Sequence, residues 1–312
     1  MIWAYLGPRA EPPPLPDFEA NTDASAGVWT MLRDCNWLQA LESDIDTVHF
    51  AFLHMGHLQP EDAASENFLY YQLRERAPRY SVADTPFGTS YGAYRSARED
   101  SYYWRIAHFL FPFWTMIPAG ALLLNRSARA WVPMDDTHTM FFLLTAPPAG
   151  NHAVFPEATR TAPFPFGLQT EFLPDTSDWF GRSRVRYGPA NDWGLERERA
   201  RKRETFTGLP DVVMEDQAIT ESMGPLYNRS QEHLGTSDEM VVRTRRRLLR
   251  AAVALRNQGV TPPGVDAPEL YRQRSGGVIL SREADWQQAT EELRQAYVEH
   301  SAEAVQRSIG AR

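Results

Sequence analysis

The stretch SYYWRIAHFLFPFW, residues 101–114, decides the fold class. It is dense in aromatic and branched side chains, which favour β-strands. Three neighbouring stretches have the same character and are separated by turn residues: TSYGAYRSARED (89–100), ALLLNRSARAWVPM (121–134) and THTMFFLLTAPP (137–148). We predict consecutive antiparallel strands from residue 88 to about residue 173. Parts of these strands are apolar on both faces, so helices are expected to cover the sheet.

Helical patterns flank this strand region on both sides. Residues 28–55 carry an apolar stripe and are predicted to form one helix. Thr236 and Glu239 have the spacing of a capping box before a second helix, which Gly259 is expected to end. A last amphipathic helix is predicted over residues 285–305. A helix, a meandering sheet and further helices indicate an α+β fold.

Two segments look irregular. Residues 174–211 are polar and charged, and we predict a long surface excursion there. At the start, a short aromatic strand over Ile2–Leu6 leads into residues 8–17, which contain five prolines and are typical of an extended linker. Two interpretations are equally favoured: the strand completes an upstream domain that is missing here, or the segment is an N-terminal arm packed on the domain.

Composition limits the class of protein. The chain has 312 residues, 43% of them hydrophobic, which is enough for a substantial core. Its net charge of −8 argues against nucleic-acid binding, which depends on neutralising phosphates. It has no run of 18 apolar residues, so no membrane-spanning helix is expected. Its only cysteine, Cys35, excludes an internal disulfide and a cysteine-based zinc motif, and is typical of the reducing cytoplasm.

The most informative motif lies in CNWLQALESDIDTVHFAFLH, residues 35–54. On a continuous helix Glu42, Asp46 and His49 are spaced four and three residues apart and share one face. The neighbouring stripe is apolar and consists of Leu41, Ile45, Val48 and Phe52. His54 follows His49 by five residues, so the helix must end or distort near residues 52–54 for the two imidazoles to converge.

Two histidines and one carboxylate are the ligands of the facial triad in non-haem Fe(II) oxygenases. A lone histidine is more often a hydrogen-bonded core or surface residue. The D-x2-H-x4-H spacing on an apolar helix makes metal binding about as well favoured as that interpretation. His57 lies just past the pattern and is expected to be a bystander.

The same stretch resembles the mononuclear-iron motif of Rieske-type aromatic-ring-hydroxylating oxygenase α subunits, E-x3-D-x2-H-x4-H. IWAYLGP with the prolines after it resembles the end of that family's Rieske domain and the following linker. VPMDDTHTM (132–140) resembles a strand-edge segment of the catalytic domain, and residues 206–238 resemble the segment with the third iron ligand. GVTPPGVDAPELYRQRSG (259–276) is similar to the tail of the branch containing phthalate dioxygenases and aryl O-demethylases. The resemblance covers essentially the whole chain.

The resemblance implies roles for individual residues. His49, His54 and Asp216 match the iron ligands. Asp46 matches the family's bridging aspartate, which hydrogen-bonds a ligating histidine and links the iron to the Rieske cluster of a neighbouring subunit; we count it as catalytic. Glu42 has a supporting role or none.

The implied fold is a helix grip (START/Bet v 1-like), an antiparallel sheet wrapped over a long helix. Residues 1–20 would then be the remnant of a Rieske-domain strand and its linker, and residues 21–312 the mononuclear-iron catalytic domain. The aromatic residues of 102–114 and 141–142 are expected either to line the cavity of this fold or to form plain core.

The resemblance also implies cofactors and partners. Mononuclear Fe(2+) would react with O2 and an aromatic, carboxylated substrate by hydroxylation or O-demethylation. A chain with one cysteine cannot hold the family's 2Fe–2S cluster, whose ligands follow C-x-H and C-x2-H spacing. A Rieske domain or a ferredoxin/reductase donor must therefore supply electrons, and the isolated chain is not expected to turn over by itself. We expect a cytoplasmic homotrimer with no nucleic-acid or membrane partner.

Two other classes of function stay open at this point. A helix-grip cavity can hold an apolar small molecule without chemistry, as a non-catalytic binding module. A zinc hydrolase could use the same ligands, but the sequence lacks a general-base motif such as H-E-x-x-H.

Overall fold

The structure is a computed structural model and describes residues 2–54, 68–146 and 171–301. Its centre is one antiparallel sheet in the order β1-β7-β6-β5-β4-β3-β2, with β8 paired to β4. The strands are β1 (Gly27–Arg33), β2 (Arg79–Thr85), β3 (Gly88–Ser96), β4 (Ser101–Leu110), β5 (Trp114–Met116), β6 (Ser127–Pro133), β7 (Thr139–Thr145) and β8 (Gly276–Ser281). The strands predicted between residues 88 and 145 are confirmed, while residues 147–170 lie outside the described part.

Strand β4 has neighbours along both of its edges. One edge pairs with β3 over residues 102–110. The other pairs with β8 over residues 101–106 and with β5 over residues 108–110. Both faces of the strand are also covered, because Ala107 and Phe109 enter one core while Trp104 and Ile106 enter another. This explains why SYYWRIAHFL is mostly apolar on both faces instead of alternating.

The prediction of one helix over residues 28–55 is wrong. Residues 27–33 form β1, which pairs with β7 along its full length. The segment GVWTMLR supplies branched and aromatic side chains with alternating directions, and Trp29 and Met31 pack into the core on one face of the sheet. The helical part begins only at α2.

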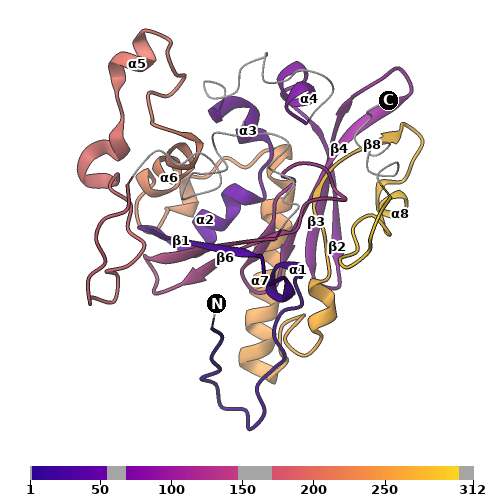
Figure 1. Ribbon diagram of the computed structural model, residues 1–312, viewed down its shortest axis with the longest axis horizontal. Helices are drawn as coiled ribbons and strands as arrows, with labels where there is room; N and C mark the ends of the chain where they lie inside the picture. The colour runs from indigo at the N-terminus through magenta and orange to yellow at the C-terminus, as the bar shows by residue number, and fades with distance from the viewer. Residues whose placement is uncertain (1, 55–67, 147–170, 302–312) are drawn as a thin grey trace.

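The helices are α1 (Glu19–Thr22), α2 (Trp37–Asp44), α3 (Val48–Leu53), α4 (Phe68–Arg74), α5 (Arg197–Arg201), α6 (Val212–Ser222), α7 (Glu239–Gln258) and α8 (Trp286–Ala289), with 3-10 turns η5 (Pro189–Gly194), η6 (Arg229–Gln231), η7 (Thr236–Asp238) and η8 (Pro268–Tyr271). The long helix α7 packs against β3 and β2, and α2 packs against β6 and α6. The C-terminal end of α7 projects below the sheet in Figure 1. The α+β class and the helix-grip arrangement, a sheet wrapped over a long helix, are confirmed.

The main core lies between the sheet and helices α2, α6 and α7. It contains, among others, Met31, Leu41, Ile45, Tyr91, Phe109, Trp131, Phe141, Leu143, Met214 and Met240. Alternation along β7 separates two faces, because Phe141 and Leu143 enter this core while Phe142 and Leu144 enter a second one around Trp114. No helix in the described ranges combines the length and the apolarity that a membrane span requires.

Two predicted helix boundaries differ in outcome. Gly259 does end α7, with a left-handed φ of 70°. The Thr236–Glu239 capping box is wrong, because the 3-10 turn η7 precedes α7 and the Asp238 carboxylate accepts the Gly235 N–H at 2.7 Å. The helix predicted over 285–305 is also wrong, since α8 ends at Ala289 and residues 302–312 lie outside the described part.

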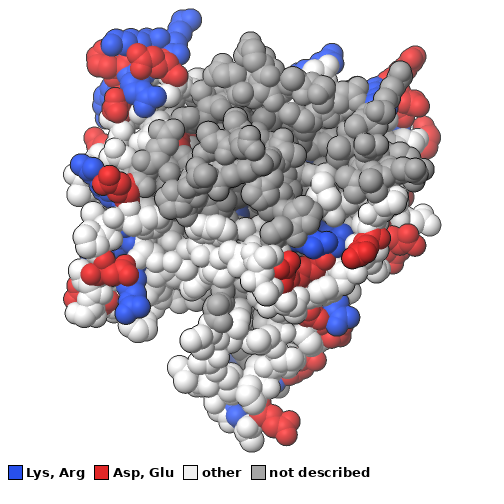
Figure 2. Space-filling model, viewed as in Figure 1, with Lys and Arg blue, Asp and Glu red and all other residues white. Residues whose placement is uncertain are grey.

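The N-terminal segment and the excursion lie on the surface. Ile2–Leu6 forms no strand, and Ile2 and Leu6 are almost fully exposed; a strand needs a paired neighbour, and none of the described strands pairs with this segment. Residues 174–211, predicted to be an irregular excursion, contain the short turns η5 and α5, and Val185 within them forms an isolated bridge with Phe172. Charges of both signs gather over α5 within this excursion (Figure 2).

Candidate metal centre

A break between α2 and α3 places the first histidine. The chain leaves helical geometry between Ile45 and Thr47. The Asp46 carboxylate accepts the backbone N–H groups of Val48 at 2.7 Å and His49 at 3.2 Å, so it caps the start of α3. The continuous helix that placed Glu42, Asp46 and His49 on one face does not exist. The end of α3 at Leu53 agrees with the requirement that the helix stop near residues 52–54.

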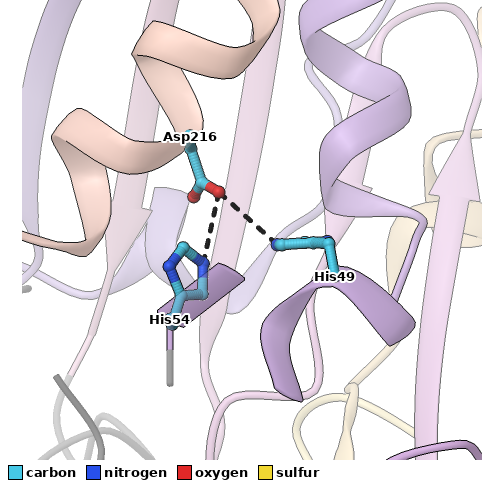
Figure 3. Close-up of side chains that lie close together, drawn as sticks. All are labelled: His49, His54 and Asp216. Carbon is cyan, nitrogen blue, oxygen red and sulfur yellow. Dashed lines mark ion pairs between the residues drawn. The ribbon is translucent and has the colours of Figure 1, made fainter. Parts of the chain in front are cut away.

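The carboxylate partner comes from α6, some 160 residues further along the chain. Asp211 caps this helix by accepting the N–H groups of Val213 and Met214, both at 2.9 Å. Within α6, Asp216 Oδ1 lies 3.4 Å from His49 Nε2 and 3.2 Å from His54 Nε2 (Figure 3). One nitrogen or oxygen atom of each residue lies within 4.8 Å of the others. The structure therefore brings together all three of the predicted ligands.

The geometry of this cluster fits a transition-metal ion. Two donors about 2.1 Å from one ion and at right angles lie roughly 3 Å apart, close to the two measured separations. Asp216 Oδ1 is buried and has no hydrogen-bond partner among the described residues. An ion bonded to that oxygen would remove this unfavourable state. Two imidazoles and one carboxylate are also the donor set expected for Fe(II) with open positions.

The outer nitrogens of the two imidazoles have unequal contacts. His54 Nδ1 lies 2.7 Å from Glu215 Oε2, and Glu215 is fully buried. His49 Nδ1 lies 3.4 Å from Asp46 Oδ2 and makes no hydrogen bond with the described residues. Sequence reasoning missed Glu215, and its only signal was its position next to Asp216.

Electrostatics couple the three groups in the absence of a metal. Burial alone lowers the pKa of His49, but the Asp216 and Asp46 carboxylates outweigh burial and raise that pKa to about 10. Burial raises the pKa of Asp216, but His54 and His49 outweigh it and hold that pKa far below its usual range. Protons on the imidazoles thus neutralise the carboxylate, and a bound cation would displace them.

Glu42 has a structural role that the sequence did not indicate. Its carboxylate receives two hydrogen bonds from Arg245, at 2.6 and 2.7 Å, and lies 3.2 Å from Arg229. These contacts join α2 to α7. Among the described residues, Glu42 makes no ion pair or hydrogen bond with His49, His54 or Asp216. His57 lies outside the described residues.

A cavity of about 120 Å³ adjoins the cluster. Its aromatic lining consists of Phe50, Tyr91, Trp131 and Phe141. Of the aromatic residues that were expected to line the cavity, only Phe141 does so among the described residues. Those of 102–114 pack elsewhere, and Phe142 faces the second core. Both histidines and Asp216 also line the cavity, so a molecule held there would lie beside the metal centre.

Three arginines lie in the cavity wall together with three aspartates, Asp44, Asp46 and Asp216. Arg33 donates to Thr220 and pairs with Glu221 at 3.4 Å, and Arg129 pairs with Asp44. Arg105 is buried and donates to the neutral oxygens of Thr47, Gln72 and Pro118. A guanidinium in a wall that excludes water favours an anionic group on the bound molecule.

Comparison with known proteins agrees with this chemistry. A family described as LigXa C-terminal domain like matches residues 4–308. The chain is 39% identical to the 3-chlorobenzoate-3,4-dioxygenase oxygenase subunit of Comamonas testosteroni, over 94% of this chain and 68% of that relative. It is 32% identical to the phthalate 4,5-dioxygenase oxygenase subunit of Pseudomonas putida, over 92% of this chain and 64% of that relative.

The chain thus spans about two thirds of the length of these curated relatives. Among solved structures, dicamba monooxygenase bound to dicamba matches with a TM-score of 0.42 and 12% identity, over 76% of this chain and 61% of that one.

Proposed function

The chain belongs to the LigXa C-terminal domain-like family, and we propose on this basis that it is the mononuclear-iron catalytic part of a Rieske-type oxygenase. One observation carries the proposal: His49, His54 and Asp216 converge at a cavity lined by aromatic and cationic side chains. Residues 21–312 would form the catalytic domain, and residues 1–20 would be a linker segment before it.

His49, His54 and Asp216 would hold Fe(2+) through two nitrogens and one oxygen. The bound ion would supply activation of dioxygen at the positions that the protein leaves open. The aromatic cavity wall would orient the substrate ring beside the ion and exclude water. Asp46 precedes α3 and lies beside Nδ1 of His49, whereas Asp216 lies beside Nε2 of the same ring. On that side of His49, Asp46 would form the route by which electrons arrive.

The proposed substrate is an aromatic compound that carries a carboxylate. The relatives named for 3-chlorobenzoate and phthalate support this class, since both names denote aromatic carboxylates. The guanidinium of Arg105 lines the same cavity and would be a group that binds this carboxylate. The reaction would be hydroxylation or O-demethylation with an oxygen atom from O2. Both relatives are oxygenase subunits, which favours this function over a non-catalytic binding module.

Electrons must come from a cluster that this chain does not hold. A Rieske 2Fe–2S cluster needs two cysteines and two histidines, and this chain has only one cysteine. A Rieske domain or a ferredoxin with its reductase is therefore the proposed donor. The resemblance to Rieske oxygenases supports a homotrimer, and the single cysteine supports a cytoplasmic location.

The test begins with anaerobic purification, addition of Fe(II) and quantitation of bound metal. The iron-loaded chain is then supplied with a Rieske donor, its reductase, isotopically labelled dioxygen and a panel containing phthalate and 3-chlorobenzoate. We expect one iron per chain and labelled product only when the donor is present. Failure to bind Fe(II), or no labelled product from any aromatic carboxylate at full iron loading, would contradict the proposal.

A further inference from the structure

The ring of His54 is held between two consecutive carboxylates of α6. Glu215 Oε2 lies 2.7 Å from Nδ1, and Asp216 Oδ1 lies 3.2 Å from Nε2. Successive residues of a helix point about 100° apart, so two adjacent side chains of α6 contact the two nitrogens of the same imidazole. His54 itself is only 2% exposed.

The carboxylate of Glu215 is fully buried. It has no exposed surface, and a buried carboxylate is costly unless hydrogen bonds or charges compensate. Its second oxygen accepts a hydrogen bond from Thr207 Oγ1, while its backbone N–H donates to Asp211 O at 3.0 Å within α6. Thr207 thus fixes one oxygen of the side chain, and the other oxygen faces His54.

The other histidine lacks an equivalent contact. His49 Nδ1 is 3.4 Å from Asp46 Oδ2, and the two backbone N–H groups at the start of α3 occupy that carboxylate. The two imidazoles thus differ, because one has its outer nitrogen fixed by a buried carboxylate and the other does not.

We propose that Glu215 is the positioning residue that makes His54 a metal ligand. A neutral imidazole carries its proton on one nitrogen, and an acceptor at Nδ1 keeps the proton there. The lone pair of Nε2 then points toward Asp216 and His49, where the ion would lie. A carboxylate acceptor also makes the imidazole more basic and fixes the ring plane. This inference rests on the proposed function, since it concerns the metal that the site would hold.

The experiment measures Fe(II) affinity by anaerobic competition with a coloured chelator, so it needs neither substrate nor electron donor. The variants are Glu215→Leu, which removes the acceptor, and Glu215→Gln, which keeps an acceptor oxygen but no charge. We expect a loss of about 10- to 100-fold in affinity for Glu215→Leu and a smaller loss for Glu215→Gln. The visible spectrum of the Co(II) form should change in the same order, because the position of one ligand changes.

Glu221→Gln is the matched control. Glu221 is another buried glutamate of α6, but it contacts Trp193, Gln217 and Arg33 instead of His54. Its substitution should lower the stability of the metal-free protein and leave iron affinity unchanged. If Glu215→Leu does not fold, the nearly isosteric Glu215→Gln decides by the same measurements.

The outcomes distinguish failure of the proposed function from failure of the proposed role of Glu215. A parent protein that binds no Fe(II) refutes the proposed function itself. A parent that binds Fe(II), with folded Glu215 variants of equal affinity and unchanged Co(II) spectra, overturns the role of Glu215 and leaves the proposed function standing. Equal loss of affinity in the Glu215 variants and in Glu221→Gln, in step with lost stability, shows a purely structural role and also overturns it.

Discussion

The Asp46 carboxylate caps the start of α3 and also lies beside Nδ1 of His49. Replacing Asp46 by asparagine separates these two roles. One carboxylate oxygen accepts the Val48 N–H at 2.7 Å, and the other accepts the His49 N–H at 3.2 Å and lies 3.4 Å from His49 Nδ1. Asparagine retains one acceptor oxygen and can still cap α3. Its amide group replaces the second oxygen, so a donor would face the donors of His49.

The structure gives an expected magnitude for each role. Asparagine caps helices about as well as aspartate, so the loss in stability should not exceed about 1 kcal/mol, a small part of the roughly 5–15 kcal/mol that stabilises a typical domain. Loss of a carboxylate beside a ligating histidine typically costs about 10- to 100-fold in metal affinity or activity. We expect most of this cost in turnover, because His49, His54 and Asp216 all remain to hold the iron.

The assay compares product formation by the parent and Asp46→Asn with a supplied reductase and Rieske donor, beside iron quantitation and thermal unfolding of each sample. Asp46→Ala is the companion variant, since it removes the cap as well and should also lose about 1 kcal/mol of stability. If Asp46→Asn matched the parent rate at equal iron content, Asp46 would be only the cap of α3 and electrons would reach the iron by another route.

Three further outcomes are expected. His49→Ala or His54→Ala should abolish iron binding because each leaves two protein ligands, while His57→Ala should retain iron; near-full occupancy in both of the first two variants would refute the ligand assignment. Burial and the charge of Arg294 lower the pKa of His108 to about 3 from 6.5, so the unfolded chain binds this proton more readily. The free energy of unfolding should therefore fall by about 1.4 kcal/mol per pH unit as pH drops below 6.5, and His108→Asn should lack that part of the slope in denaturant titrations. Asp44→Ala should destabilise the fold by about 3–5 kcal/mol in the same titrations, because it leaves the partly buried Arg129 without this carboxylate and removes the acceptor of Thr115 and Trp131; a loss below about 1 kcal/mol would mean that water reaches the pair.

The sequence determined those features that depend on neighbours along the chain. Dense aromatic and branched residues between 88 and 145 predicted strands, and the structure confirms them. The spacing of Asp46, His49 and His54 identified the candidate site and required a helix end near residue 54, where α3 does end. Gly259 was recognisable because a left-handed residue after a helix is a local property of the backbone.

Local patterns failed where pairing decided the structure. Residues 27–33 are compatible with a helix as well as a strand, and only pairing with β7 selects the strand. Apolar periodicity suggested one helix through residue 53. The Asp46 carboxylate instead accepts the backbone N–H of Val48 at the start of α3, and this hydrogen bond competes with a continuous helix.

The tertiary structure alone decided the composition of the metal centre. Asp216 was one acidic residue among 40 in the sequence, and only resemblance to a family pointed to it. Glu215 carried no signal beyond its position next to Asp216, because its significance is a distance of 2.7 Å to a ring 161 residues away. Chain spacing determines which side chains share a helix face, whereas packing α6 against α2 determines which carboxylates reach the histidines that follow it.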